Sequence, residues 1–368
     1  ACSRRHDRLV RNRVVHCGQV LKVICPMRQP LRLFFLLLPI LIVGCAQPVK
    51  PTLPPAPAPT PAPTPAPPIT APAPAPVAPK PAEPTATPVL SAEKRAAFID
   101  EAAKTSGMAP AEIRAWLDQA RYQQSIINAI TRPAEGKPWK DYRPIFLTET
   151  RIRQGREFYA ENRSDLDKVA AQTGVPAEII VSIMGVETSY GRITGTYRVL
   201  DALYTLGFFY PRREEFFRSE LIHLFSLARE EKLDLATLKG SYAGAMGLGQ
   251  FMPSSYRNFA RDGDDDGRRD LLGSRKDAFA SIANYFIGHG WQTGTPAFIP
   301  AVKDAGAAAF VPEDFVARYS LADLAARGYR PRDPGAPELP ATLLTLEGAS
   351  GPEYWIGYQN FYVITRYN

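Results

Sequence analysis

The segment GVETSYGR, residues 185–192, sets the expected fold and chemistry of this chain. It ends an apolar run, PAEIIVSIMGVET, that has the pattern of a helix with Pro176 at its first turn. Four apolar residues precede Glu187 by three, four, seven and eight positions and would share its helix face: Met184, Ile183, Ile180 and Ile179. A carboxyl group held against such a face loses solvation, which raises its pKa and favours the neutral acid. The pattern predicts a general acid at Glu187, with an exposed glutamate at a frayed helix end as the alternative.

A second segment, KGSYAGAMGLGQFMPSSY at residues 239–256, is rich in glycine. Glycine allows the backbone to approach a ligand closely. Ser241, Gln250 and Tyr256 stand among the glycines and offer polar groups. Sugars need hydrogen-bond donors, acceptors and aromatic rings at their binding sites. The segment therefore predicts a saccharide-binding turn, with a tightly packed helix junction as the alternative.

Helical periodicity dominates the chain after Leu90 and weakens beyond Gly290. The clearest helical windows are residues 91–107, 109–130, 148–174 and 210–230. Two later segments, residues 341–348 and 360–368, alternate like short strands. These patterns predict a mainly α fold of the α+β class with a small C-terminal β subdomain.

An apolar segment precedes this globular part. Residues 27–44, MRQPLRLFFLLLPILIVG, have the pattern of a signal peptide, and LIVGC at residues 41–45 resembles a bacterial lipobox. This arrangement predicts cleavage before Cys45 and lipidation of its thiol, which would anchor the protein firmly through acyl chains. An ordinary secretory signal with an incidental cysteine is the alternative.

The basic charge is concentrated upstream. The formal net charge is +7, but residues 1–26 carry six basic side chains and one aspartate, and residues 27–44 add two arginines. We expect residues 1–26 to be a non-native upstream extension, so the mature chain from Cys45 would be almost neutral. This balance argues against a nucleic-acid partner. The other three cysteines also lie in residues 1–26, so we expect neither a disulfide nor a cysteine metal site.

Residues 45–89 would form the lipid anchor and a linker. The segment from Gln47 to about Thr87 is almost entirely Pro, Ala and Thr and has too little apolar surface for a core. Roughly 40 residues at about 3.1 Å each span on the order of 120 Å when extended. The pattern predicts a tether that leads to a globular domain at residues 90–368, with a proline-rich ligand for a partner domain as the alternative.

Six motifs occur in order between about residue 140 and residue 368: WKDYRP, GVETSYGR, YPRREEFF, KGSYAGAMGLGQFMPSSY, IANYFIGHGW and NFYVITRYN. Together they resemble the family of lytic murein transglycosylase B, membrane-bound peptidoglycan lyases with a lysozyme-like core. The resemblance implies a lysozyme-like helical core with an additional helical segment. It also implies cleavage of the β-1,4 bond between N-acetylmuramic acid and N-acetylglucosamine, which leaves a 1,6-anhydromuramoyl end and adds no water.

The resemblance makes Glu187 the single catalytic acid and then base. It implies that other matching positions line the saccharide groove or support the carboxyl: Ser241, Gln250, Tyr142, Arg212, Arg213, Tyr285, Tyr367 and Asn368. The family continues beyond TRYN with another helical segment, whereas this chain stops at Asn368. We therefore expect a truncated C-terminus.

An ordinary glycosidase flanks the scissile bond with two carboxyl groups, whereas one stands out here. If the substrate's N-acetyl group attacks the anomeric carbon, Glu187 protonates the leaving oxygen and later accepts the proton of the C6 hydroxyl. Four further carboxylates are possible partners of Glu187 in a two-carboxylate mechanism, so a hydrolase remains an alternative: Asp201, Glu214, Glu215 and Glu220. The alternatives are thus a hydrolytic muramidase and, given the short C-terminus, a non-catalytic peptidoglycan-binding lipoprotein.

The acidic segment DGDDDGRRDLLG, residues 262–273, follows part of the EF-hand pattern. Its candidate calcium ligands are Asp262, Asp264, Asp266, the carbonyl of Arg268, and Asp270. Position twelve is Gly273, where a bidentate glutamate is usual. The family resemblance implies a calcium loop at this place, and a solvated acidic turn is the alternative. We expect a structural calcium ion and no cofactor for the chemistry.

The partners implied by the resemblance are peptidoglycan glycan strands and complexes for cell-wall synthesis. The lipid anchor adds the outer membrane. Ala46 follows Cys45 where an aspartate would oppose sorting to that membrane. The predicted location is the periplasmic face of the outer membrane.

Overall fold

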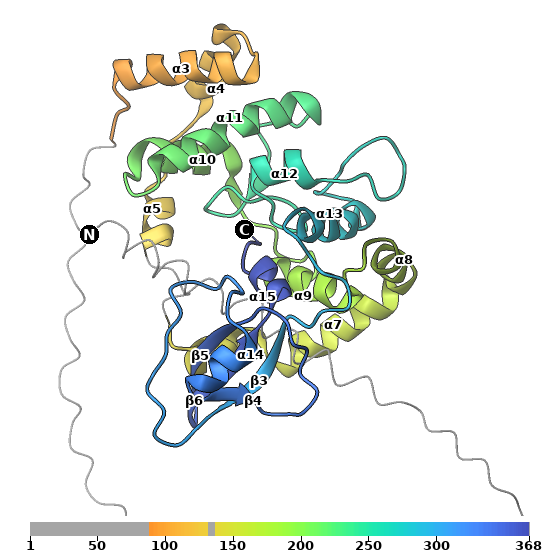
Figure 1. The fold of residues 1–368 in the computed structure, drawn as a ribbon. Helices are drawn as coiled ribbons and strands as arrows, with labels where there is room; N and C mark the ends of the chain where they lie inside the picture. Colours follow the sequence, from red (N-terminus) through yellow and green to blue (C-terminus); the bar gives the residue numbers. More distant parts are fainter. Residues whose placement is uncertain (1–87, 132–136, 368) are drawn as a thin grey trace, which may run out of the picture. The chain divides into compact units, whose positions relative to one another are not determined.

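The computed structural model describes residues 88–131 and 137–367 of the chain. Helices predominate in these ranges, and the strands are short (Figure 1). The helices are α3 (Ala92–Ser106), α4 (Pro110–Gln119), α5 (Gln124–Thr131), α6 (Trp139–Phe146), α7 (Glu149–Glu161), α8 (Arg163–Thr173), α9 (Ala177–Thr188), α10 (Val199–Phe209), α11 (Glu214–Glu230), α12 (Pro253–Phe259), α13 (Arg275–Gly288), α14 (Leu321–Ala326) and α15 (Gln359–Ile364).

Several helices begin at a hydroxyl cap. Ser91, Thr148 and Ser274 precede α3, α7 and α13, and each hydroxyl accepts a hydrogen bond of 3.2 Å from the backbone N–H three residues on. Such a cap satisfies one of the N–H groups that a helix leaves unpaired at its start. The local sequence thus fixes where these helices begin.

Helix α9 is buried on almost all sides. Nine of its 12 residues are buried, and it packs against α7, α8 and α13. Around it, the ring of Phe158 on α7 lies 5.9 Å from that of Phe279 on α13. A helix that is apolar all round belongs in a core. This burial fixes the orientation of α9, which carries Glu187 one residue before its end.

The strands form two small antiparallel sheets. Strands β1 (Tyr197–Arg198) and β2 (Lys239–Gly240) pair with Tyr197 opposite Gly240. A second sheet has the order β4-β3-β6-β5 and consists of β3 (Phe298–Lys303), β4 (Tyr329–Pro331), β5 (Thr342–Gly348) and β6 (Gly351–Gly357).

The four-stranded sheet has its own apolar core. Helix α14 packs against β4, and the buried side chains there include Leu324, Tyr329, Leu343 and Ile356 (Figure 1). Helix α6 contacts strand β5. The predicted mainly α fold with a small C-terminal β subdomain is therefore confirmed.

Three local expectations were wrong. Residues 360–368 were expected to form a strand, but Gln359–Ile364 is helix α15, because a short apolar run satisfies either period until packing selects one. The helix expected over residues 148–174 is two helices that meet at Asn162, and residues 109–130 are likewise divided between α4 and α5. At the first break, the Asn162 side chain donates to the carbonyl of Phe158 at 2.7 Å.

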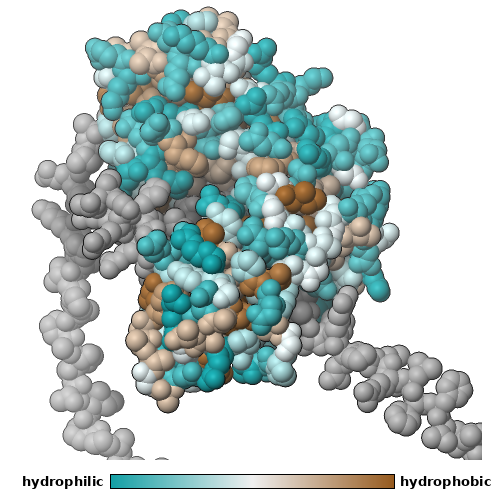
Figure 2. All heavy atoms as spheres, viewed as in Figure 1, coloured by the Kyte–Doolittle hydropathy of each residue, from teal (hydrophilic) through white to brown (hydrophobic). Residues whose placement is uncertain are grey.

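In the described part of the chain, no single helix is long and apolar enough to cross a membrane. Helices α8 and α9 together are long and apolar enough to do so by length and composition, but the pair is bent by 118°. On the face drawn in Figure 2, hydrophilic residues predominate and apolar residues form small separate patches. The predicted extension, signal peptide, Cys45 and nearly all of the linker lie outside the described residues.

Candidate active site

Glu187 is the penultimate residue of α9 and is partly buried. The two residues that precede it by one turn, Ile183 and Met184, are fully buried. The helix does not fray here, because the N–H of Tyr190 donates to the carbonyl of Met184 at 2.8 Å and that of Ile193 to Thr188 at 2.9 Å. The carboxyl group therefore projects from a closed and ordered helix end.

A left-handed turn follows Glu187 directly. Ser189, Tyr190 and Gly191 have φ angles of 50°, 64° and 85°. This region is unfavourable for residues other than glycine and persists only where neighbouring structure imposes it. Two consecutive residues with side chains in this conformation mark the turn as a constrained element.

Thr188 links this turn to the glycine-rich segment. Its hydroxyl lies 3.0 Å from the carbonyl of Leu248 and 3.1 Å from that of Met184, and it accepts the N–H of Gly191 at 2.9 Å. One side chain thus joins the end of α9, the turn and the segment that carries Gln250. The sequence motif contained this threonine, but we assigned it no role because its partner is 60 positions away.

Ser241 follows strand β2 and closes a tight loop. Its hydroxyl oxygen accepts the N–H groups of Ala243 and Ala245 at 3.2 and 3.1 Å, which leaves its O–H to donate elsewhere. Gly195 lies against the same loop, since a Cβ added to it would lie 2.0 Å from the carbonyl oxygen of Gly240. The two backbone segments can approach this closely only because Gly195 has no Cβ.

Gln250 is held at φ 51° and is only 6% exposed. Its amide nitrogen donates to the carbonyls of Thr194 at 3.0 Å and Gly247 at 2.9 Å, which uses both of its protons. Among residues 88–131 and 137–367, no donor reaches its Oε1. The amide therefore keeps an acceptor for a ligand while its donors hold two loops together.

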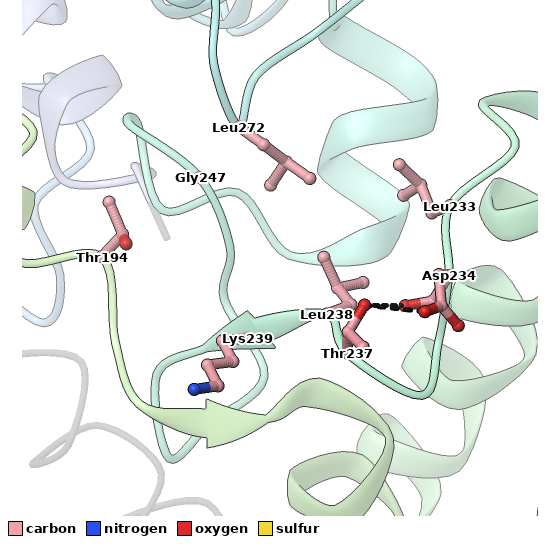
Figure 3. Close-up of a pocket in the computed structure, with 8 residues that line it drawn as sticks. All are labelled: Thr194, Leu233, Asp234, Thr237, Leu238, Lys239, Gly247 and Leu272. Carbon is pink, nitrogen blue, oxygen red and sulfur yellow. Dashed lines mark hydrogen bonds between the residues drawn. The ribbon is translucent and has the colours of Figure 1, made fainter.

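A cavity of about 290 Å³ lies beside these loops (Figure 3). Thr194 and Gly247, the two residues to which Gln250 donates, both line it. Three leucines and three polar residues complete the lining: Leu233, Leu238 and Leu272, and Asp234, Thr237 and Lys239. Gln250 thus holds together two loops that line a hollow of the size that a small ligand occupies.

Tyr367 and Tyr285 lie in an aromatic cluster behind the glycine-rich segment. The Tyr367 hydroxyl donates to the carbonyl of Gly249 at 2.8 Å, next to Gln250. Its ring lies 4.9 Å from that of Tyr285, whose hydroxyl donates to the carbonyl of Arg366. Burial raises the pKa of Tyr285 to about 12, so it remains a neutral donor. These two tyrosines brace the segment from behind.

The remaining predicted groove residues are more scattered. Tyr142 is 2% exposed on α6, with its ring 5.2 Å from that of Phe146. The guanidinium carbon of Arg213 lies 4.2 Å from the centre of the Phe216 ring at the start of α11, and Arg212 is exposed. Asn368 lies outside the described residues. Contact with glycan by these residues stays a prediction.

Tyr256, singled out with Ser241 and Gln250, is instead part of the core. It is 1% exposed, its hydroxyl accepts the N–H of Leu271 at 3.0 Å, and it donates to the carbonyl of Arg269. Burial raises its pKa to about 12. The residue fastens α12 to the end of the acidic loop.

Two of the alternative carboxylates are engaged in holding the fold. Asp201 accepts the N–H of Arg121 at 2.8 Å and pairs with Arg198. Glu220 is 4% exposed, and its two oxygens accept the N–H of Ser254 at 2.9 Å and its hydroxyl at 2.6 Å. Glu220 thereby caps the start of α12.

The other two lie on α11. Glu214 pairs with Lys94 at 3.3 Å and with Arg218 at 2.7 Å. Glu215 is exposed. A second catalytic carboxylate therefore has no candidate among these four that is both buried and uncommitted.

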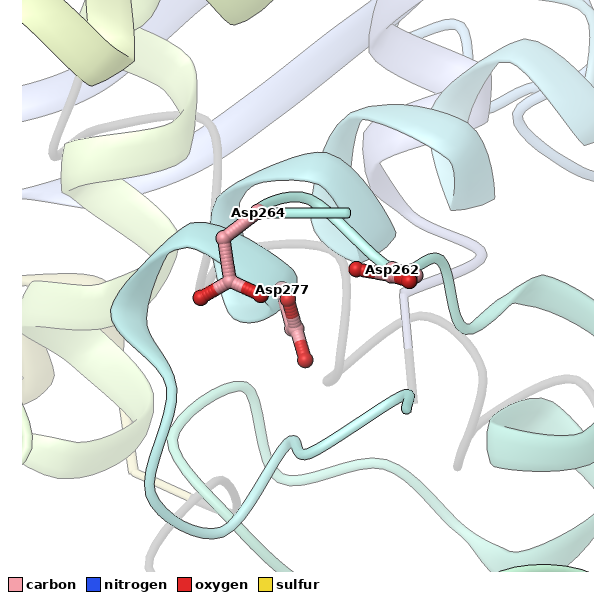
Figure 4. A group of neighbouring side chains, drawn as sticks. All are labelled: Asp262, Asp264 and Asp277. Carbon is pink, nitrogen blue, oxygen red and sulfur yellow. The ribbon is translucent and has the colours of Figure 1, made fainter. Parts of the chain in front are cut away.

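The acidic loop gathers three carboxylates that differ in part from the expected set (Figure 4). Oxygens of Asp262, Asp264 and Asp277 lie within 4.8 Å of one another. Asp277, on α13, was missed because it lies beyond the twelve-residue pattern. It is fully buried, and desolvation raises its pKa. Such a group of oxygens matches the preference of calcium.

Three of the predicted acidic ligands hold the loop backbone. Asp262 accepts the N–H groups of Asp266 and Gly267 at 3.2 and 2.7 Å. Asp266 accepts the N–H of Arg268 at 2.8 Å, and Asp270 accepts the N–H groups of Leu272 and Gly273 at 3.0 and 2.9 Å. Their role as calcium ligands, and that of the Arg268 carbonyl, stays a prediction.

The chain is similar to known enzymes over its globular part. The family model described as Transglycosylase SLT domain matches residues 91–368. Membrane-bound lytic murein transglycosylase B of Escherichia coli (strain K12) is 41% identical over 281 residues, which are 74% of this chain and 77% of that protein.

Solved structures agree with this similarity. Catenated lytic transglycosylase SltB1 from Pseudomonas aeruginosa has a TM-score of 0.69 at 46% identity, over 76% of this chain and 92% of its own. The Escherichia coli lytic transglycosylase Slt35, solved in complex with calcium, has a TM-score of 0.67 at 41% identity, over 74% and 86%. These matches confirm the predicted lysozyme-like core. The chain therefore belongs to the lytic murein transglycosylases that carry the transglycosylase SLT domain.

Proposed function

We propose that Glu187 is the single acid and base of this peptidoglycan lytic transglycosylase. The observation that carries the proposal is the link from Thr188 to the carbonyl of Leu248, at 3.0 Å, which holds the end of α9 against the glycine-rich segment. Glu187 then stands at the junction of a buried helix and a segment that offers Ser241 and Gln250. A general acid needs such a fixed position relative to its substrate.

In the proposed mechanism, Glu187 first protonates the oxygen that leaves C1 of the N-acetylmuramoyl residue. The substrate's N-acetyl oxygen attacks C1 as the glycosidic bond breaks, in place of a second carboxylate. The Glu187 carboxylate then accepts the proton of the C6 hydroxyl, whose oxygen closes the 1,6-anhydro ring and displaces the N-acetyl oxygen. Ring closure is intramolecular and gains the corresponding entropic advantage.

Ser241 and Gln250 would orient the sugar. The free Oε1 of Gln250 accepts from a hydroxyl or an N-acetyl N–H, and the O–H of Ser241 donates. Tyr367 acts behind them by holding the backbone at Gly249, and Tyr285 packs against Tyr367 and holds the backbone at Arg366. Tyr142, Arg212, Arg213 and Asn368 complete the proposed glycan contacts.

Product analysis tests the reaction. Purified peptidoglycan digested with the protein should yield muropeptides that end in 1,6-anhydromuramic acid, one water lighter in mass spectrometry than the reducing ends of a hydrolytic digest. Water is excluded as the acceptor when the C6 hydroxyl attacks first. A parallel digest with a hydrolytic muramidase supplies the comparison. Reducing ends alone would identify a hydrolase, and binding without release would identify a non-catalytic protein.

We also propose that the acidic loop binds calcium through Asp262, Asp264 and Asp277, with the Asp266, Arg268 and Asp270 positions contributing as first predicted. Calcium should raise the melting temperature, because it binds the folded loop and relieves repulsion among the carboxylates. At a concentration 100 times Kd the gain is about 2.7 kcal/mol, or roughly 5 °C or more.

Asp277→Asn should abolish this rise in a thermal-shift titration with calcium chloride and chelator. Asp265→Asn is the matched control, since Asp265 is exposed on the same loop and Asn tolerates its φ of 63°. An identical calcium response in both variants and the parent would reject this ligand set.

The named membrane-bound relative indicates association with the cell envelope. We propose that residues 27–44 are removed, that Cys45 is lipidated and that residues 45–89 tether the catalytic domain, residues 90–368, to the periplasmic face of the outer membrane. Glycan strands are then the partner within reach. Recruitment to complexes for cell-wall synthesis stays a prediction.

A further inference from the structure

The turn after Glu187 is held from a second side by helix α7. The ring of Tyr190 fits against two glycines: a Cβ added to Gly155 on α7 or to Gly185 on α9 would lie 2.5 or 2.8 Å from its hydroxyl oxygen. The Tyr190 hydroxyl donates to the backbone carbonyl of Arg151 at 3.0 Å. Burial raises the pKa of Tyr190, so this donor stays protonated.

The Arg151 side chain reaches the same turn. Its Nη2 donates to the hydroxyl of Ser189 at 3.0 Å, and its guanidinium carbon lies 5.3 Å from the centre of the Phe146 ring. Arg151 thus contacts the left-handed turn twice, through its carbonyl and through its guanidinium. Ser189 is two positions after Glu187.

Arg151 occupies this place against local preference. It is the third residue of α7, where the helix dipole disfavours a cation. In the described part of the chain its Nη1 is a buried donor without a hydrogen-bond acceptor. Local rules are broken most often where function requires it. Stability alone does not account for an arginine here.

We propose that Arg151 is a positioning residue for the catalytic step. Its bond to Ser189 holds the strained turn against α7, in addition to the bond between Thr188 and Leu248, so that the end of α9 keeps one orientation. This inference rests on the proposed role of Glu187. A carboxyl group that moves by about 1 Å loses on the order of 100-fold in rate, whereas remote glycan contacts are unaffected.

The test compares Arg151→Met with Arg153→Met in the full chain. Methionine keeps an unbranched apolar stem and removes the guanidinium group, and the backbone carbonyl still accepts from Tyr190. Arg153 lies on the same helix and is largely exposed, and its partner among the residues that the structure describes is Glu157, in a long ion pair of 3.7 Å. We expect Arg151→Met to lower kcat about 10- to 100-fold with KM within about twofold, and Arg153→Met to change neither.

Two milder variants separate positioning from folding. Ser189→Ala should lower kcat by roughly 2- to 10-fold and leave the melting temperature unchanged. In the Ser189→Ala protein, the further substitution Arg151→Met should lower kcat by a smaller factor than it does in the parent. Arg151→Lys, which can still donate to Ser189, should recover part of the rate.

The outcomes are distinct. Equal kcat in Arg151→Met and Arg153→Met overturns the proposal, as does additivity of the Ser189 and Arg151 substitutions. A kcat loss that only follows the loss of folded protein overturns it too. If Glu187→Gln is inactive while Arg151→Met is normal, only this inference fails, whereas an active Glu187→Gln protein removes the proposed catalytic role itself.

Discussion

Glu187→Gln is expected to lower the rate of peptidoglycan solubilisation by about 10²- to 10⁴-fold, the range that a general acid and base contributes. The amide neither donates a proton to the leaving oxygen nor accepts one from the C6 hydroxyl, so both half-reactions are affected. The substitution keeps the size of the side chain at the end of α9. Release of anhydro-muropeptides, followed by chromatography, measures the loss.

Glu178→Gln is the matched control, because Glu178 is an exposed residue in the first turn of the same helix. It should keep the parental rate. Both proteins should bind sacculi and melt at the parental temperature, which would assign the loss to chemistry. Parental activity in Glu187→Gln would refute the role of this carboxyl group.

Gly195→Ala should have the largest effect on stability among conservative changes near the site. Gly195 has a φ of 101°, and its new methyl group would meet the carbonyl oxygen of Gly240 at 2.0 Å and the N–H nitrogen of Ser241 at 2.6 Å. Neither backbone atom can move away cheaply. We expect a loss of about 3 kcal/mol in the free energy of unfolding, from strain in φ and from overpacking. Urea denaturation measures it.

Gly107→Ala isolates the conformational part of this cost. Gly107 ends α3 with a φ of 67°, and an added Cβ would meet nothing within 4 Å. The expected loss is about 1 kcal/mol. Similar losses in the two variants would show that the approach of Gly195 to the Ser241 loop is not tight. Weakened glycan binding should accompany Gly195→Ala alone.

Calcium and Asp277 illustrate the limit of pattern matching. The EF-hand pattern located the acidic segment, but it expects the last calcium ligand at the twelfth position, where this chain has Gly273. The buried carboxylate that joins Asp262 and Asp264 comes from α13, four residues further on. A pattern of fixed spacing cannot predict a residue that lies outside the pattern and is brought back to the loop by the following helix.

The aromatic residues show the same limit from the other direction. Tyr285 and Tyr367 were named as possible contacts of the glycan or supports of the carboxyl, and sequence could not choose between these roles. In the structure their rings pack together and their hydroxyls bind backbone carbonyls. Whether a tyrosine is buried depends on the assembled core, and the spacing of residues along one sequence does not show it.

By itself, the sequence determined the helical class, the apolar helix that ends near Glu187, and the two segments to which we assign the chemistry in our proposal. These follow from local periodicity, proline and glycine positions, and an ordered set of motifs. Only the tertiary structure decided that α15 is a helix, that Thr188 bonds Leu248, and that Arg151 braces Ser189. Each of those depends on atoms far apart in the chain meeting at one place, because hydrogen bonds and packing act over a few ångströms of space and not over sequence.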